Sequence, residues 1–87
     1  MIDPQYHPPV KRSVTIAGHE TSVSLEPLFW QLLEATAREA GLPLNALVAR
    51  VDAERLTVAA PPNLASALRT YLLQTLRNKL DAANASQ

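Results

Sequence analysis

The 87-residue chain contains no cysteine, only two glycines, and one residue each of Trp, Phe and Met. Without cysteine, neither a disulfide nor a thiolate metal site can stabilise the fold. No stretch approaches the ~20 apolar residues of a membrane span, and the N-terminus lacks the basic lead and apolar run of a signal peptide. A domain of this size buries only about 60 % of its unfolded surface. We therefore expect a soluble, cytoplasmic protein that buries further surface by forming a homodimer.

Groups that carry chemistry are equally scarce. Neither His7 nor His19 has a partner at the spacing of a metal or catalytic site, and no GxSxG, HExxH, CxxC or phosphate-binding glycine loop occurs. These absences predict no enzymatic activity, no cofactor and no metal. Eight basic and eight acidic residues give zero net charge, unlike the basic balance of most nucleic-acid binders, although the local distribution of charge matters more than its total.

The N-terminal quarter of the chain indicates a flexible arm followed by β structure. Residues 1–10 hold three prolines, which suit neither a helix nor a central strand. The next two runs, KRSVTI and TSVSLE, alternate apolar with polar residues, as half-buried strands do. Gly18 lies between the runs. It marks either a hairpin turn or a kink in one longer extended segment, and the sequence does not distinguish the two.

Two amphipathic helices should follow. The first, from about Pro27 to Ala40, presents Phe29 and Leu33 on its apolar face and carries Trp30 on the flank, half-buried. Gly41 ends this helix. The second, over residues 43–54, is expected to bury a stripe made of Leu44, Leu47, Val48 and Val51.

A third helix is predicted over residues 64–80, after a capping Asn63. Its apolar arc, which runs from Leu64 to Leu80, is wider than a small monomer needs, so we infer contact with both its own protomer and a partner subunit. The tail, residues 81–87, is expected to fray. Residues 11–80 then form one domain.

The order strand, helix, Gly-containing break, helix resembles the ribbon-helix-helix family of the Arc/CopG type. The matching segments are TSVSLEP, LFWQLLEATAREAGL and PLNALVARV. KRSVTIAGHETSVSLEPLFW together with NLASALRTYLL resembles a subfamily with an extended N-terminal strand and an added C-terminal helix. The resemblance covers Lys11 to Leu76. It implies a mainly α fold with a short β ribbon, in which two protomers pair their strands over one shared core. Such a ribbon enters the major groove of DNA, and the N-terminus of the second helix offers amides to a phosphate.

The resemblance also assigns residues to these roles. The expected dimer core consists of Val23, Leu25, Phe29, Leu33, Leu47, Val48 and Val51. The expected DNA-binding residues are Lys11, Arg12, Glu20, Ser22, Ser24, Leu44 and Asn45. Two positions depart from the family pattern: Glu20 stands where a basic residue is common, and Pro43 where a serine-like cap is common. Lys11 and Arg12 are the cations that can compensate.

The sequence therefore predicts a homodimeric DNA-binding protein, a transcriptional regulator that inserts an antiparallel ribbon into the major groove of double-stranded DNA. The alternative is a dimeric interaction module, such as an antitoxin-like adaptor, that uses the same fold and binds a protein through the helix over residues 64–80. Zero net charge, Glu20 in the ribbon and the wide apolar arc of residues 64–80 favour the alternative.

Overall fold

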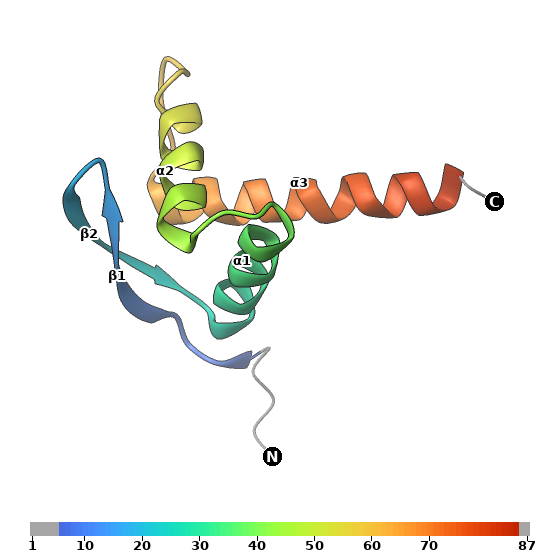
Figure 1. Ribbon diagram of the computed structural model, residues 1–87, viewed down its shortest axis with the longest axis horizontal. Helices are drawn as coiled ribbons and strands as arrows, with labels where there is room; N and C mark the ends of the chain where they lie inside the picture. Colours follow the sequence, from blue (N-terminus) through green and yellow to red (C-terminus); the bar gives the residue numbers. More distant parts are fainter. Residues whose placement is uncertain (1–5, 86–87) are drawn as a thin grey trace.

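The computed structural model describes residues 6–85, in which a β hairpin precedes three α helices (Figure 1). The elements are β1 (Val10–Ile16), β2 (His19–Leu25), α1 (Pro27–Glu39), α2 (Leu44–Arg55) and α3 (Leu64–Ala85). The predicted fold class, mainly helical with a short β ribbon and an added C-terminal helix, is confirmed. Residues 1–5 of the predicted arm and 86–87 of the predicted tail lie outside the described residues. None of the helices within residues 6–85 is long and apolar enough to cross a membrane.

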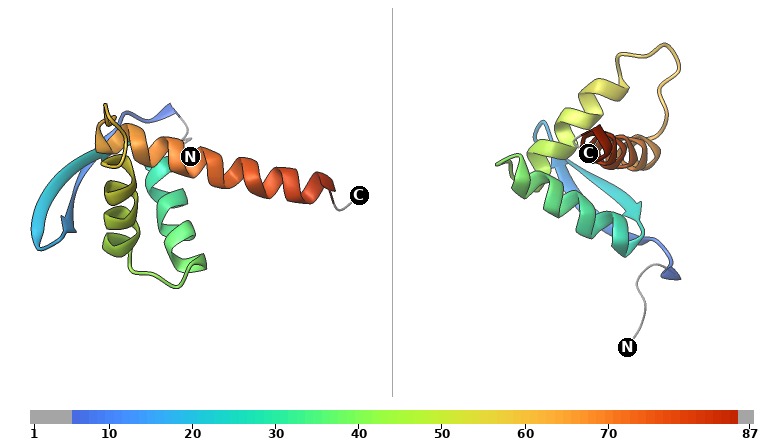
Figure 2. Two further views of the ribbon diagram at one scale, coloured as in Figure 1. Left: turned by 90° about the horizontal axis from the view of Figure 1, so that it is seen from above. Right: turned by 90° about the vertical axis from the view of Figure 1, so that its right-hand side faces the viewer.

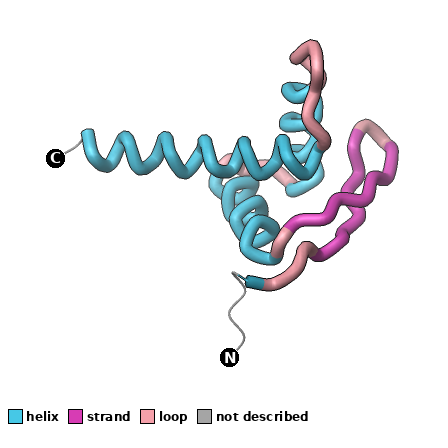
Figure 3. Tube along the Cα trace, turned by 180° about the vertical axis from the view of Figure 1, so that it is seen from behind, coloured by secondary structure: helices cyan, strands magenta, loops and turns pink. Residues whose placement is uncertain are grey.

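The two extended runs form a hairpin, and not one long strand. β1 and β2 pair antiparallel from Val10↔Leu25 to Ile16↔His19, and the hairpin curves beside the helices (Figure 3). The turn contains two residues, Ala17 and Gly18, with φ angles of 51° and 82°. Positive φ at both central residues is characteristic of the type I′ turn, whose twist matches that of paired strands. Both strands of the ribbon therefore come from one chain.

The break between α1 and α2 follows from Gly41, which adopts a φ of 70°. The amide of Leu42 donates to the carbonyl of Ala37 at 2.9 Å, and that of Gly41 donates to Arg38 at 3.1 Å. This pair of hydrogen bonds is a Schellman motif, which ends α1 and satisfies two of its last carbonyls. Pro43 then stands just before α2 with extended backbone angles.

α3 begins as predicted and ends later than predicted. The side chain of Asn63 accepts a hydrogen bond from the Ser66 amide at 2.8 Å, which caps the helix. The helix continues to Ala85, five residues beyond the predicted end at Leu80. Its C-terminal half extends past α1 and α2, as Figure 1 and the left view of Figure 2 show, and its buried residues all lie between Leu64 and Leu72.

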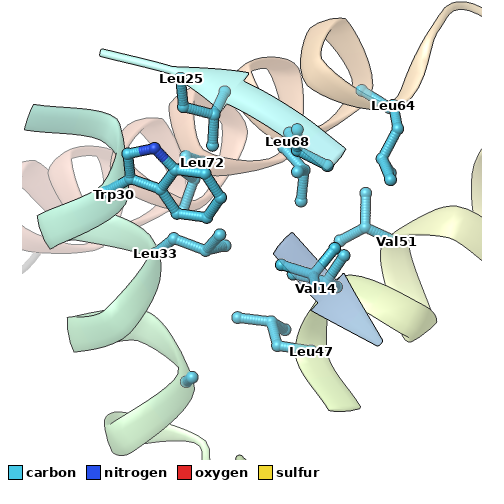
Figure 4. Packing of buried hydrophobic residues seen from close by; sticks show 13 residues of the cluster. Val14, Leu25, Trp30, Leu33, Leu47, Val51, Leu64, Leu68 and Leu72 are labelled. Carbon is cyan, nitrogen blue, oxygen red and sulfur yellow. The ribbon is translucent and has the colours of Figure 1, made fainter. Parts of the chain in front are cut away.

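One hydrophobic core joins all five elements (Figure 4). It consists of Val14, Val23, Leu25, Trp30, Leu33, Ala37, Leu47, Val48, Val51, Leu64, Ala67, Leu68 and Leu72. Six of the seven residues predicted for a dimer core are therefore already buried within one chain. α3 packs against α1 and α2 and so completes this core.

Trp30 and Phe29 differ from the expected pattern of burial. Trp30 was expected on the flank, half-buried, and is instead only 3 % exposed, whereas Phe29 is half-buried at the edge of the core. The indole N–H of Trp30 donates to the carbonyl of Val10 at 2.8 Å. Because that hydrogen bond satisfies its polar atom, the ring can be buried at little cost.

Candidate nucleic-acid interface

The hairpin presents one polar, exposed face. Alternate residues of a strand point to opposite sides of the sheet, and Val14, Val23 and Leu25 point toward the helices. The opposite face consists of Lys11, Ser13, Thr15, Glu20, Ser22 and Ser24, all of them exposed. We call these six residues the outer ribbon face. It contains four of the predicted DNA-binding residues. Ser13 and Thr15 were not predicted, although the alternation around Val14 places them beside Ser22 and Glu20.

The outer ribbon face carries one cation and one anion. Glu20 pairs with Thr15 in the strand register, which lies four residues from Lys11, so the two charges are separated by roughly 13 Å along the ribbon. Neither side chain forms an ion pair within residues 6–85. The face is therefore neutral in sum, with its positive charge near the open end of the hairpin and its negative charge near the turn.

Arg12 lies on the opposite, helix-facing side of the hairpin. Its guanidinium donates to Glu34 of α1 at 2.7 Å and lies 4.6 Å from the ring centroid of Trp30. A guanidinium above an indole is a favourable cation–π arrangement. Of the two cations predicted to face DNA, only Lys11 lies on the outer ribbon face, and Arg12 ties β1 to α1.

The N-terminus of α2 abuts the edge of β1. The pair next to a two-residue turn is hydrogen-bonded, so the amide of Thr15 points away from β2. The side-chain carbonyl of Asn45 accepts from this amide at 3.1 Å. The backbone amides of Leu44 and Asn45 have no acceptor among the described residues, as is usual for a first helical turn. Two unpaired amides therefore stand beside the ribbon.

The outer edge of β2 differs from that of β1. By the same register, the backbone groups of Glu20, Ser22 and Ser24 point away from β1. A shallow cleft separates this edge from the start of α3, with Ser22 and Ser24 on one wall and Asn63 and Leu64 on the other. Val23 and Ala65 also line this cleft, so its walls are both polar and apolar.

A family model described as "Ribbon-helix-helix domain" matches residues 9–76. Neither the comparison with curated proteins nor the comparison with solved structures found a match. The matched segment covers most of the chain and includes the hairpin, α1, α2 and the core-forming half of α3. The chain belongs to the ribbon-helix-helix domain family.

Proposed function

We propose that this protein is a cytoplasmic, homodimeric transcriptional regulator that inserts the β1–β2 ribbon into the major groove of double-stranded DNA. Ribbon-helix-helix domains are generally DNA-binding regulators or antitoxins, and the fold is a non-enzymatic one. The observation that carries the proposal is the two-stranded ribbon with an exposed polar face, because the major groove has the width of such a ribbon.

Four residues of the outer ribbon face and the start of α2 have a role in the proposed complex. Ser22 and Ser24 contact base edges, and Glu20 accepts a hydrogen bond from the N4 amino group of cytosine. Lys11 pairs with a phosphate near the open end of the hairpin. The unpaired amides of Leu44 and Asn45 bind a second phosphate, which the positive end of the α2 dipole favours. Arg12 keeps the ribbon on α1 and contributes through that support.

The test is a titration of labelled genomic DNA fragments, followed by fluorescence anisotropy over a range of salt concentrations. Wild-type affinity should fall steeply as salt rises, because bound phosphates release counterions. Lys11→Ala should weaken binding and reduce the slope of log K against log salt by about 0.9 for each phosphate that the variant no longer neutralises.

The matched control is Arg77→Ala, which removes an exposed cation from the C-terminal half of α3. That half of the helix points away from the hairpin (Figure 1). This variant should keep the wild-type slope. Two results would contradict the proposal: a wild-type protein without salt-dependent affinity at low salt, or equal slopes for Lys11→Ala and wild type.

A second candidate function is a protein-interaction module built on the same fold. The observation that favours it is the neutral outer ribbon face, together with leucines exposed on α3. This function predicts no salt-dependent DNA affinity, and a protein partner that wild type captures and that Leu73→Glu does not. Retention of the partner by both Leu73→Glu and Leu76→Glu, each first shown to leave the dimer intact, would argue against α3 as its binding site.

A further inference from the structure

A cleft lies between the last turns of α2 and the first half of α3. The connection between the two helices, residues 56–63, lines it as well and leads from the end of α2 back to the start of α3 (Figure 1). The cleft has a volume of about 380 Å³, within the range of ~300–1,000 Å³ that is usual for small-molecule sites. Val51, Val58 and Ala67 supply apolar surface, and Tyr71 adds an aromatic ring. The cleft can therefore hold the apolar body of a small molecule.

The cleft carries one charge that the chain does not neutralise. Its cation, Arg55, donates to the carboxylate of Asp52 at 2.7 Å and to the carbonyl of Pro62 at 3.1 Å. Its carboxylate, Glu54, is exposed and forms no ion pair within residues 6–85. Glu54 also lies in the last turn of α2, where the helix dipole contributes partial negative charge. The potential in the cleft is therefore negative.

The other polar groups of the cleft add hydrogen-bond acceptors. The hydroxyls of Ser66, Thr70 and Tyr71 have no hydrogen-bond partner in the part of the chain that the structure describes, and a hydroxyl oxygen accepts as well as donates. The side-chain amide of Gln74 donates to Asn78 at 2.9 Å, so its carbonyl oxygen can still accept. With the donors of Arg55 engaged by Asp52 and Pro62, a ligand that brings hydrogen-bond donors and a positive charge matches this lining best.

We propose that this cleft is a binding site for a small organic amine, an ammonium group attached to an apolar body. The ammonium pairs with Glu54 and donates to hydroxyls of the cleft, while the body covers Val51 and Val58. The ring of Tyr71 adds an aromatic face, which attracts a cation. An anion would be repelled by Glu54 and by the negative end of α2. No residue of the cleft belongs to the hairpin or to the start of α2, so this site is separate from the proposed DNA interface.

A nuclear magnetic resonance titration of the full chain tests the site with three probes that share a phenyl ring and differ in their polar group. Phenethylamine is a cation at neutral pH, because alkyl amines titrate near pH ~10; phenethyl alcohol is neutral, and phenylpropionate is an anion. Phenethylamine should bind with a dissociation constant below ~1 mM and at least ~10-fold more tightly than the alcohol. Phenylpropionate should not bind. The amide resonances that shift should be those of α2, α3 and their connection around the cleft.

Glu54→Gln removes the charge of the cleft and keeps the shape of the side chain. It should weaken phenethylamine binding ~10-fold and leave the affinity for phenethyl alcohol unchanged. Its thermal melt should match wild type, since the side chain is exposed. The matched control is Asp81→Asn, which removes an exposed carboxylate of α3 outside the cleft and should keep the wild-type affinity.

Four results would overturn the proposal: no binding of phenethylamine up to ~10 mM, equal affinity for the three probes, shifts confined to residues away from the cleft, or wild-type affinity in Glu54→Gln. The titration contains no DNA, so its failure leaves the proposed regulator untouched, and a protein without DNA affinity can still bind the amine.

Discussion

Trp30 holds the start of the ribbon, and Trp30→Phe measures the strength of that connection. The indole N–H donates to the Val10 carbonyl at 2.8 Å, and the ring is only 3 % exposed. Val10 is the first residue of β1 and precedes Lys11, the cation of the outer ribbon face. Phenylalanine retains an aromatic ring at this position but has no donor and a smaller volume. The variant should therefore loosen β1 at its open end.

The expected loss of stability can be estimated from these contacts. A typical intramolecular hydrogen bond contributes about 1 kcal/mol to the free energy of unfolding. The smaller ring leaves a cavity in a closed core, which costs about another 1 kcal/mol. The Arg12 guanidinium lies 4.6 Å from the ring centroid. Its attraction to a phenylalanine ring is weaker than its attraction to tryptophan by a few tenths of a kcal/mol. A loss of about 2 kcal/mol is a large fraction of the ~5–15 kcal/mol that stabilises a small domain.

Urea unfolding followed by far-ultraviolet circular dichroism measures this loss, since Trp30 is the only tryptophan of the sequence and its fluorescence disappears in the variant. Phe29→Leu, at the half-buried neighbour, is the control and should cost less than about 1 kcal/mol. A double-mutant cycle of Trp30→Phe with Arg12→Met should give a coupling energy of about 0.5 kcal/mol. A loss below about 0.5 kcal/mol for Trp30→Phe would refute the role assigned to the indole hydrogen bond.

Two further predictions concern single carboxylates. Glu20→Gln removes the negative charge of the outer ribbon face and keeps a side-chain oxygen that can accept from cytosine N4. DNA affinity should therefore rise about two- to fivefold at low salt and less at high salt, as anisotropy would measure; an unchanged affinity would indicate that Glu20 lies away from the DNA. A hydrogen bond from its own backbone amide and the Arg69 guanidinium lower the pKa of the Glu26 carboxyl from its ordinary value of 4.5. The ionised form therefore stabilises the fold above that value, and the contribution is lost as the pH falls through the lowered pKa. Thermal melts of wild type and Glu26→Gln should differ most at neutral pH and converge as the pH falls through the lowered pKa; a difference that stays constant across the acid range would refute the assignment.

The sequence predicted the elements of the fold well, because each has a strong local cause. Gly41 requires a positive φ and ends α1, and Asn63 supplies the cap of α3. The hairpin was harder to predict, since only Gly18 indicates its turn. Ala17 also adopts a positive φ, which alanine rarely does. No residue preference at that position distinguishes the turn from a kink in a longer strand.

The places of Trp30 and Arg12 depend on contacts that are distant in sequence. A helical wheel treats Trp30 as a flanking apolar residue, but its hydrogen-bond partner Val10 lies 20 residues earlier in the chain. Arg12 is two residues from Val14 and shares its face by strict alternation. The adjacent pair Lys11 and Arg12 suggests one basic patch by composition, whereas the period of the strand divides it between two faces. When the alternation is applied to each residue in turn, it places Lys11 and Arg12 on opposite faces of the ribbon.

Because β1 completes the ribbon and α3 completes the core within one chain, the ribbon and the dimer interface can be considered separately. The family resemblance implies that the second strand of the ribbon and part of the core come from a partner protomer. In this chain β1 supplies the second strand, and α3 closes the core with Leu64, Leu68 and Leu72. A protomer that closes its own core need not share that core in order to fold, so a dimer is free to form on another surface. Substitutions of the outer ribbon face should then change DNA affinity without changing self-association and without unfolding the chain. Linkage between the two would appear only where DNA holds both protomers at once, as an affinity that depends on protein concentration.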